Sequence, residues 1–316
     1  MIFIFAEDSD YSINDIIDWL IFYNKKYYRI NDSTSLFVSY ISIIGKSFTI
    51  NLEDKQGNRI KLTEKSQILI RRASNIKFLP SKEYSRELSV VKEHLYRESH
   101  ALNTAVKSLL NSISMFGNFV DNASFSKIEI MRKAALCGLN IPDTHIISNC
   151  SQLRMGISNY KALITKAISN GYARTGGKEL NYYTERVVEI PSVEEFFPSL
   201  IQPQIQKLAD VRVFFASRTF FTTAIMSQRN PQTKVDFRRY DRNKPNRVLR
   251  LKLPNGIEEK LRNLMDLLEL NSGSIDLILD RFGQYTFLEV NPEGQFAQVS
   301  FPGAYYVEKF IANTYE

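Results

Sequence analysis

The sequence has few of the residues that bind zinc or form disulfide frameworks. Its 316 residues include two cysteines, Cys137 and Cys150, and three histidines. The cysteines form no CxxC pair. This composition argues against a zinc site, a disulfide-stabilised fold and sulfur chemistry.

Long hydrophobic runs are also lacking. The only strongly apolar opening, MIFIFA, is followed at once by Glu7 and Asp8. It is far shorter than a membrane span and has no basic start of the kind that signal peptides carry. We therefore expect a cytoplasmic protein with no membrane partner.

Low-complexity tracts and internal repeats are absent as well, and the composition is that of a folded protein, with 44% hydrophobic and 24% charged residues. The length predicts two or three lobes rather than one compact unit. The net charge of +7 suits a nucleic acid, an anionic nucleotide or an acidic peptide. Because the basic residues are scattered, apart from FRRYDRNKPNR at 237–247, we expect no nucleic-acid partner.

The first section, residues 1–115, alternates between strands and helices. MIFIFA predicts a strand, Ser12 is expected to cap an amphipathic helix, and KYYRIN returns as a second strand. This βαβ opening predicts a small open α/β sheet. The residues QGN at 56–58 predict a turn between two further strands. A long helix from about 82 to 110 closes the section, and SISMFGNFVDNAS at 112–124 is expected to be a linker.

A second section, residues 116–190, begins with a helix that the sequence delimits at both ends. Ser126 with Glu129 three residues later has the form of a capping box, and Gly138 suits the left-handed C-cap. Further on, the strand ALITKA carries Lys166 and is followed by the small-residue loop SNGYARTGGK. The section therefore mixes helix and strand, and the fold class of the chain is α/β (α+β).

The third section, residues 191–316, is mainly strands with one helix, IEEKLRNLMDLLEL, and its last two strands form a hairpin, IDLILD and YTFLEVN. Both strands alternate, so each has a core side and an opposite side. The core side is expected to hold Leu277, Leu279, Leu288 and Val290, and the other side Asp276, Ile278, Phe287, Glu289 and Asn291. A two-residue turn at Phe282-Gly283 places Asp276 opposite Glu289, whereas a three-residue loop with a glycine bulge shifts the pairing by one.

The pairing of Asp276 with Glu289 predicts a cation site. Two carboxylates about 5 Å apart across neighbouring strands repel each other, so a cation is expected between them. The two carboxylates and the amide oxygen of Asn291 are hard oxygen ligands that suit Mg²⁺, with positions left open for water and substrate phosphates. A hairpin with one solvated face is the alternative interpretation.

An Asp on one strand followed by Glu-x-Asn-Pro on the next resembles the metal-binding end of the ATP-grasp enzymes. Further segments match in order: EDSDYSINDIIDWL, ILIRR, KIEIMRKAALCGLNIPDTHI, LITKA, LIQPQIQKLADVRV and FLEVNPEGQFAQVSFPGAYYVEKFIA. Over essentially the whole chain they resemble the graspetide synthetases, the grasp-with-spasm peptide maturases that include the microviridin-type macrocyclases. The resemblance implies an ATP-grasp fold, with a pre-ATP-grasp α/β lobe at 1–115, a central lobe at 116–190 and an antiparallel-sheet lobe at 191–316.

The resemblance also implies roles for individual residues. Lys127 and Lys166 would contact the phosphates of ATP, the loop 169–178 would be a flap over the nucleotide, and Mg²⁺ would be held at the hairpin. The backbone of the segment Gln202, Pro203, Gln204 and Ile205 would bind adenine, although Pro203 stands where an acidic residue is common. Asp210 and Arg212 resemble the Asp-x-Arg of the family, and Arg238 resembles an arginine that meets the phosphates.

The function implied is that of an ADP-forming ligase. It would phosphorylate Asp or Glu side chains of a ribosomal precursor peptide and join them to Thr, Ser or Lys side chains as macrocyclic esters or amides. The leader of such a precursor would bind the central lobe, and the oligomeric state, a homodimer included, is left open. The alternatives are an ATP-grasp ligase that adds a free amino acid or small amine to a carboxylate, a binding module that has lost catalysis, and a nucleic-acid binder.

Overall fold

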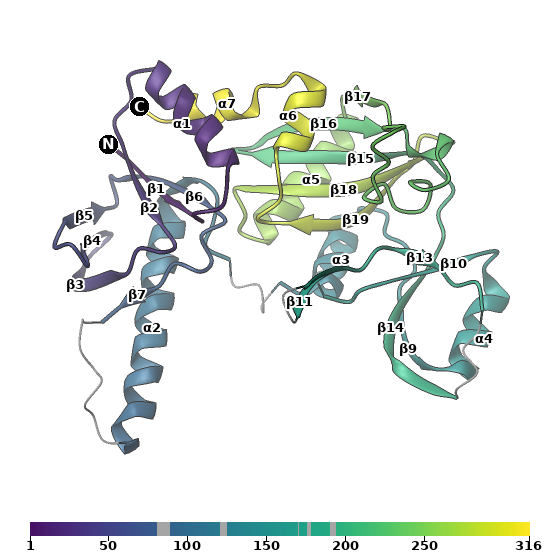
Figure 1. The fold of residues 1–316 in the computed structure, drawn as a ribbon, viewed down its shortest axis with the longest axis horizontal. Helices are drawn as coiled ribbons and strands as arrows, with labels where there is room; N and C mark the ends of the chain where they lie inside the picture. Colours follow the sequence, from purple (N-terminus) through teal and green to yellow (C-terminus); the bar gives the residue numbers. More distant parts are fainter. Residues whose placement is uncertain (81–88, 121–124, 170, 176–177, 190–193) are drawn as a thin grey trace.

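The computed structural model describes residues 1–80, 89–120, 125–169, 171–175, 178–189 and 194–316. Figure 1 shows an N-terminal lobe on one side, a small central lobe on the other, and a five-stranded sheet between them. Within the described residues no helix is long and apolar enough to cross a membrane.

The N-terminal lobe contains the expected βαβ unit. Strand β1 pairs in parallel with β2 and with β6, and β8 extends the sheet beside β6. A second sheet of order β5-β4-β3-β7 packs beside it. The elements are β1 (Ile2–Ala6), α1 (Ser12–Phe22), β2 (Tyr27–Asn31), β3 (Leu36–Ile44), β4 (Ser47–Asp54), β5 (Arg59–Thr63), β6 (Gln67–Arg71), β7 (Phe78–Leu79), α2 (Ser89–Ile113) and β8 (Ser114–Phe116).

Two expectations for this lobe are corrected. Ser12 does not cap α1 but lies inside it, and the carboxylate of Asp10 accepts hydrogen bonds from its N–H at 3.0 Å and its hydroxyl at 2.6 Å. The linker expected at 112–124 contains β8, because Ser114–Phe116 joins the edge of the parallel sheet. The start of the long helix expected at about 82, and residues 121–124 of the linker, lie outside the described residues.

The central lobe is a sheet of order β13-β10-β14-β9 with the hairpin β11-β12 beside it. Its elements are α3 (Lys127–Leu136), β9 (His145–Asn149), α4 (Cys150–Asn159), β10 (Leu163–Lys166), β11 (Tyr172–Thr175), β12 (Lys178–Asn181), β13 (Glu185–Arg186) and β14 (Glu195–Pro203). The capping box is confirmed in part, since Ser126 accepts from the N–H of Glu129 at 3.5 Å. Strand β14 pairs with β9 and β10 and so belongs to the sheet of the central lobe. The boundary expected between residues 190 and 191 would place β14 in the third section, apart from the strands with which it pairs.

The five-stranded sheet has the order β17-β16-β15-β18-β19, all antiparallel. Its elements are β15 (Lys207–Ala216), β16 (Thr219–Ile225), a 3-10 turn (Ser227–Arg229), β17 (Val248–Arg250), α5 (Asn255–Leu267), β18 (Ser272–Asp280), β19 (Tyr285–Asn291), α6 (Ala297–Gly303) and α7 (Val307–Asn313). Helices α3 and α5 cover one face. Because α3 packs against β19, its first residue, Lys127, comes next to Glu289.

The two ends of the chain share one hydrophobic core. Ile2, Ile4 and Ile16 of the first section are buried together with Val307 and Tyr315 of the last. The hydroxyl of Tyr315 donates a hydrogen bond to the carbonyl of Ile68 at 3.1 Å. The N-terminal lobe and the five-stranded sheet are therefore joined through α6 and α7.

Candidate functional site

The closing hairpin does bring Asp276 opposite Glu289, but through a different geometry from the one expected. The connection has three residues, with Gly283 at φ 80°, so that Leu277 pairs with Phe287. A bulge at Leu288 then shifts the register by one, and Asp276 pairs with Glu289. The expected two-residue turn is wrong, and the facing carboxylates are confirmed.

The bulge also exchanges the sides of two residues. Phe287 was expected beside the carboxylates but is buried in the core at 1% exposure, whereas Leu288 was expected in the core and lines the cleft. A bulge places two residues of one strand against one of its partner, so the alternation of sides changes at that point. Pattern alone cannot reveal such a change.

Each carboxylate has a cation beside it. On β15, Arg212 lies directly across from Asp276, and its Nη1 donates to both carboxylate oxygens at 2.6 and 2.7 Å. The Nζ of Lys127 lies 3.2 Å from Oε2 of Glu289. Opposite charges therefore alternate through the site, which offsets the repulsion between the two acids.

The pKa values of the two carboxyls shift in opposite directions. Burial raises the pKa of Asp276 above its ordinary value and the negative charge of Glu289 adds to this effect, although Arg212 opposes it. Burial also acts to raise the pKa of Glu289, but Lys127 and Lys166 together lower it below its usual value. Glu289 is therefore the more firmly ionised of the pair, while Asp276 depends on Arg212 for its charge.

Lys166 and Arg238 bring two further cations to the same place. Burial lowers the pKa of Lys166, and the neighbouring Lys127 and Arg238 lower it further, although Glu289 opposes them. The guanidinium of Arg238 is held by Asp236, with Nε at 2.9 Å and Nη2 at 2.6 Å from its oxygens. Anionic phosphates would relieve the crowding of these positive groups.

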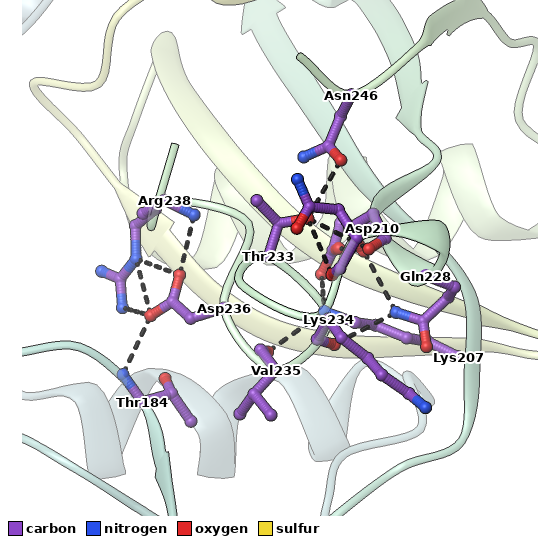
Figure 2. A network of polar contacts seen from close by, with 12 residues as sticks. Thr184, Lys207, Asp210, Gln228, Thr233, Lys234, Val235, Asp236, Arg238 and Asn246 are labelled. Carbon is purple, nitrogen blue, oxygen red and sulfur yellow. Dashed lines mark hydrogen bonds and ion pairs between the residues drawn. The ribbon is translucent and has the colours of Figure 1, made fainter. Parts of the chain in front are cut away.

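Asp236 links the five-stranded sheet to the central lobe. Figure 2 shows its carboxylate between the guanidinium of Arg238 and the backbone of Thr184, whose N–H donates to it at 2.9 Å. Although Asp236 is buried, which acts to raise its pKa, the hydrogen bonds from Arg238 and the backbone lower it. Asp236 therefore fixes Arg238 against the segment that follows the β11-β12 hairpin.

Asp210 anchors the same loop from the other side (Figure 2). Lys207 donates to one of its oxygens at 2.6 Å and the hydroxyl of Ser227 to the other at 2.5 Å. Lys207 also donates to the carbonyl of Val235 at 3.2 Å. Burial raises the pKa of Asp210 above its ordinary value, although Lys207 opposes this effect. The carboxylate of Asp210 is thus engaged with protein groups, which favours a positioning role over direct contact with a nucleotide.

In the segment 202–205, which was expected to bind adenine, most hydrogen-bond donors are already engaged with the protein. The carboxamide of Gln202 points into the central lobe, where its Nε2 donates to the hydroxyl of Thr144 at 2.8 Å. The N–H of Gln204 donates to the carbonyl of Ala162 at 2.9 Å. The N–H of Ile205 has no hydrogen-bond partner within the described residues and is the backbone donor left for a base.

A single cleft between the central lobe and the five-stranded sheet gathers most of the expected site residues. Its walls include Lys127, Lys166, Gln202, Pro203, Asp210, Arg238, Asp276 and Glu289, with the apolar side chains of Pro142, Ile164, Ile205 and Leu288. Arg212 reaches the site through Asp276. Asn291 lines an adjoining hollow that shares Lys127, Arg238 and Glu289 with the cleft. The flap expected at 169–178 corresponds to the β11-β12 hairpin, with 170 and 176–177 outside the described residues.

The donor set fits Mg²⁺ only as a site shared with a bound anion. Within the described residues no group of three or more His, Cys, Asp or Glu could hold a metal ion. Asp276 and Glu289 supply two carboxylates, and the amide oxygen of Asn291 already accepts from the N–H of Glu293 at 3.1 Å. Because Mg²⁺ is commonly bound by one or two carboxylates together with substrate phosphates, these residues suit a metal–nucleotide complex rather than an isolated ion.

Sequence reasoning missed the residues that hold the site in place. Lys207, Asp236 and Thr184 form no recognisable motif, and the separation between bonded partners varies from 2 to 52 positions along the chain. One usable signal was present: an Asp two residues before Arg238, on a loop, commonly turns back to hydrogen-bond its own neighbourhood.

Comparison with solved structures shows the fold. The chain is similar to a RiPP-associated ATP-grasp ligase from Chryseobacterium gregarium, solved in complex with ADP and a leader and core peptide. The two are 21% identical with a TM-score of 0.75, and the match covers 99% of this chain and 95% of the ligase. The macrocyclase MdnC of Microcystis aeruginosa, bound to the precursor peptide MdnA, is 22% identical with a TM-score of 0.68, covering 99% of each chain. The ATP-grasp ligase PsnB, in complex with a minimal precursor, Mg and ADP, is 13% identical with a TM-score of 0.65, over 99% of this chain and 96% of that one.

No family model and no curated protein matches the chain. The similarity to the solved structures nevertheless extends over nearly the whole length of this chain and of each compared protein, and it confirms the expected ATP-grasp fold.

Proposed function

We propose that this chain is an ATP-dependent ligase that phosphorylates an Asp or Glu side chain of a ribosomal precursor peptide. It then joins this side chain to a Thr, Ser or Lys side chain of the same peptide as a macrocyclic ester or amide. The observation that carries the proposal is the facing pair of Asp276 and Glu289, surrounded by Lys127, Lys166 and Arg238 in one cleft.

The arrangement of charges supports phosphoryl transfer. A carboxylate is a poor electrophile, and phosphorylation converts its oxygen into a good leaving group. Negative charge spreads over the transferred phosphoryl group during this step, and fixed cations stabilise it. Lys166 and Arg238 have this role, since both line the cleft and Arg238 is held rigidly by Asp236.

Asp276, Glu289 and Asn291 are the residues that would hold Mg²⁺ between the protein and the phosphates. The ion, when bound, supplies positive charge to the phosphate oxygens. Lys127, whose Nζ lies 3.2 Å from Oε2 of Glu289, would be free to meet the nucleotide if that carboxylate held the ion. Arg212 orients Asp276 through its Nη1, and its own Nε is buried and without a partner in the described part of the chain.

The adenine ring is proposed to lie against the apolar wall of the cleft. Ile164, Pro203 and Ile205 line this wall, and the N–H of Ile205 is the donor available to a ring nitrogen. Pro203 replaces an acidic side chain, so recognition of the base rests on backbone groups and apolar contact. Gln202 and Gln204 maintain the shape of the segment through their bonds to Thr144 and Ala162.

The proposal of a peptide substrate is supported by the three solved structures described above, each of which contains a leader, core or precursor peptide. The net charge of +7 agrees in sign with an acidic core peptide. Since both ATP and ribosomal peptides are made there, the cytoplasm is the proposed site of action. A ligase acting on a free amino acid or small amine would share every nucleotide contact described above.

The test is incubation of the purified protein with ATP, Mg²⁺ and the peptides encoded by short reading frames that flank its gene. Mass spectrometry is expected to show the loss of one water per ring, dependent on both ATP and Mg²⁺, with ADP released in equal amount. ADP release with free amino acids and no modification of any flanking peptide would instead establish the small-amine ligase. Absence of ATP turnover with both would contradict the proposal.

A further inference from the structure

The segment 292–295, which we call the closing turn, directly follows Asn291, a residue of the proposed Mg²⁺ site. Two hydrogen bonds tie the turn to Asn291: its amide oxygen accepts from the N–H of Glu293 and its carbonyl accepts from the N–H of Gly294, both at 3.1 Å. A shift of the closing turn would therefore move Asn291. Asn291 lines the hollow together with Arg72, the first residue after β6, so the end of β6 lies beside the site.

The closing turn is packed tightly against β18. A Cβ at Gly294 would lie 2.3 Å from the side chain of Ser274, and a Cβ at Gly273 would lie 3.2 Å from the carbonyl oxygen of Asn291. The hydroxyl of Ser274 also donates to the carbonyl of Gln295 at 3.2 Å. These approaches leave the turn no room to move towards β18, so its position also depends on its contacts with the N-terminal lobe.

The N-terminal lobe reaches the closing turn through Arg71, the last residue of β6, whose side chain is only 3% exposed. Its Nη1 donates to the carbonyls of Glu293 and Gly294 at 3.5 and 2.8 Å. Its Nη2 donates to Oε1 of Gln295 at 3.1 Å. One guanidinium therefore holds three successive residues of the turn.

Asp10 fixes the direction of this guanidinium. Its Oδ2 lies 2.9 Å from the Nε of Arg71, and its Oδ1 accepts from the N–H and the hydroxyl of Ser12 at 3.0 and 2.6 Å. Replacing a buried ion pair by apolar side chains of similar volume is often neutral for stability, because the attraction between the charges is offset by the cost of removing them from water. What the pair of Arg71 and Asp10 does supply is a fixed set of hydrogen-bond directions.

We propose that Arg71 is a positioning residue, through which the N-terminal lobe holds the closing turn and Asn291 in the geometry that Mg²⁺ requires when it binds with the nucleotide. This inference rests on the proposed function. Arg71 lines neither the cleft nor the hollow, so it acts through the backbone of the turn. Losing a group that orients a metal ligand from behind typically lowers metal affinity by about 10- to 100-fold. The N-terminal lobe thus completes the metal site.

The test measures ADP binding by isothermal titration calorimetry, in EDTA and in Mg²⁺, so that no turnover is needed. Arg71→Lys keeps a charge beside Asp10 but lacks the planar fork that reaches the turn. It is expected to bind ADP in EDTA as the wild type does, while the gain in affinity that Mg²⁺ provides falls by about 10-fold or more. Gln295→Met removes only the acceptor of Nη2 and is expected to lose part of the gain, which keeps the test open if Arg71→Lys does not fold.

Tyr315→Phe is the matched control, because the hydroxyl of Tyr315 donates to the carbonyl of Ile68, three residues before Arg71 on β6. It removes a hydrogen bond from the same junction of lobes and is expected to keep the full gain from Mg²⁺. An unchanged gain in both Arg71→Lys and Gln295→Met would overturn the inference, and so would an equal loss in Tyr315→Phe or a matching loss of ADP affinity in EDTA. If the wild type binds no ADP, or binds it equally with and without Mg²⁺, the proposed nucleotide and metal sites fail, and this role fails with them.

Discussion

Asp276→Asn and Glu289→Gln should affect stability very differently while both abolish turnover. Asp276 and Arg212 form an ion pair whose side chains are only 13% and 11% exposed. Removing one partner of a buried pair leaves the other charge uncompensated and costs about 3 to 5 kcal/mol. We expect the lower end, since an asparagine still offers one oxygen to the guanidinium. In a chain of this size 1 kcal/mol corresponds to about 2 °C, so the melting temperature of Asp276→Asn should fall by about 6 °C.

Glu289→Gln should cost much less. Its partner Lys127 lies at 3.2 Å with a 19% exposed side chain, so the freed ammonium can reach water. The substitution also removes the repulsion that Glu289 exerts on Asp276. These effects oppose each other, and we expect a change in melting temperature of at most about 2 °C.

Both substitutions remove a ligand of the proposed Mg²⁺ site, so both should lower ADP release and ring formation by at least about 100-fold. Thermal unfolding followed by circular dichroism gives the stabilities, and mass spectrometry with an ADP assay gives the activities. Wild-type turnover in Glu289→Gln would refute the assignment of the metal site. Equal melting temperatures for the two variants would refute the account of the Arg212 ion pair.

Three further predictions concern the surroundings of the site. Asp236→Asn should loosen Arg238 and raise the KM for ATP. Because the pKa of Asp236 is lowered in the folded protein, its carboxylate stabilises the fold above about pH 4, and this stabilisation is lost as the pH falls through the lowered pKa. Urea titrations should therefore show that acid destabilises the variant less than the wild type. Because the pKa of Lys166 is lowered in the folded protein, its buried charge destabilises the fold, and this cost disappears as the pH rises towards about 10.4, the pKa of a lysine in the unfolded chain. The free energy of unfolding of the wild type should therefore rise more between pH 8 and pH 10 than that of Lys166→Met. An equal pH dependence of the two proteins would contradict the burial of this charge. Gly294→Ala should lower both the melting temperature and the activity, because its Cβ would lie 2.3 Å from Ser274 and 3.0 Å from the carbonyl of Asn291, and a variant of wild-type stability would show that the closing turn can shift.

The local parts of the fold could be predicted because their signals are local. The capping residue Ser126, the turn before Asn58 and the βαβ opening each depend on residues close in sequence, and each is present in the structure. The pairing of Asp276 with Glu289 was also predicted, but the structure reaches it differently. The loop is one residue longer than expected, and a bulge in β19 restores the register.

The parts that could not be predicted depend on contacts between distant segments. The bulge at Leu288 is associated with a hydrogen bond from the N–H of Phe287 to the carbonyl of Asn140, which is 147 positions earlier. The pairing of Arg212 with Asp276 and the bond from Thr184 to Asp236 likewise join separate elements. No pattern in a single segment specifies these partners, and so the arrangement of charges in the cleft emerged only from the structure.

The core shared by the two ends of the chain has a consequence for biosynthesis. The apolar faces of β1 and α1 are translated about 300 residues before part of their cover, at Val307, Ile311 and Tyr315. Until then these faces stay exposed to association with other nascent chains. A chaperone that shields the first helix during elongation should therefore raise the yield of folded protein, and shortening the chain by its last ten residues should send it to inclusion bodies.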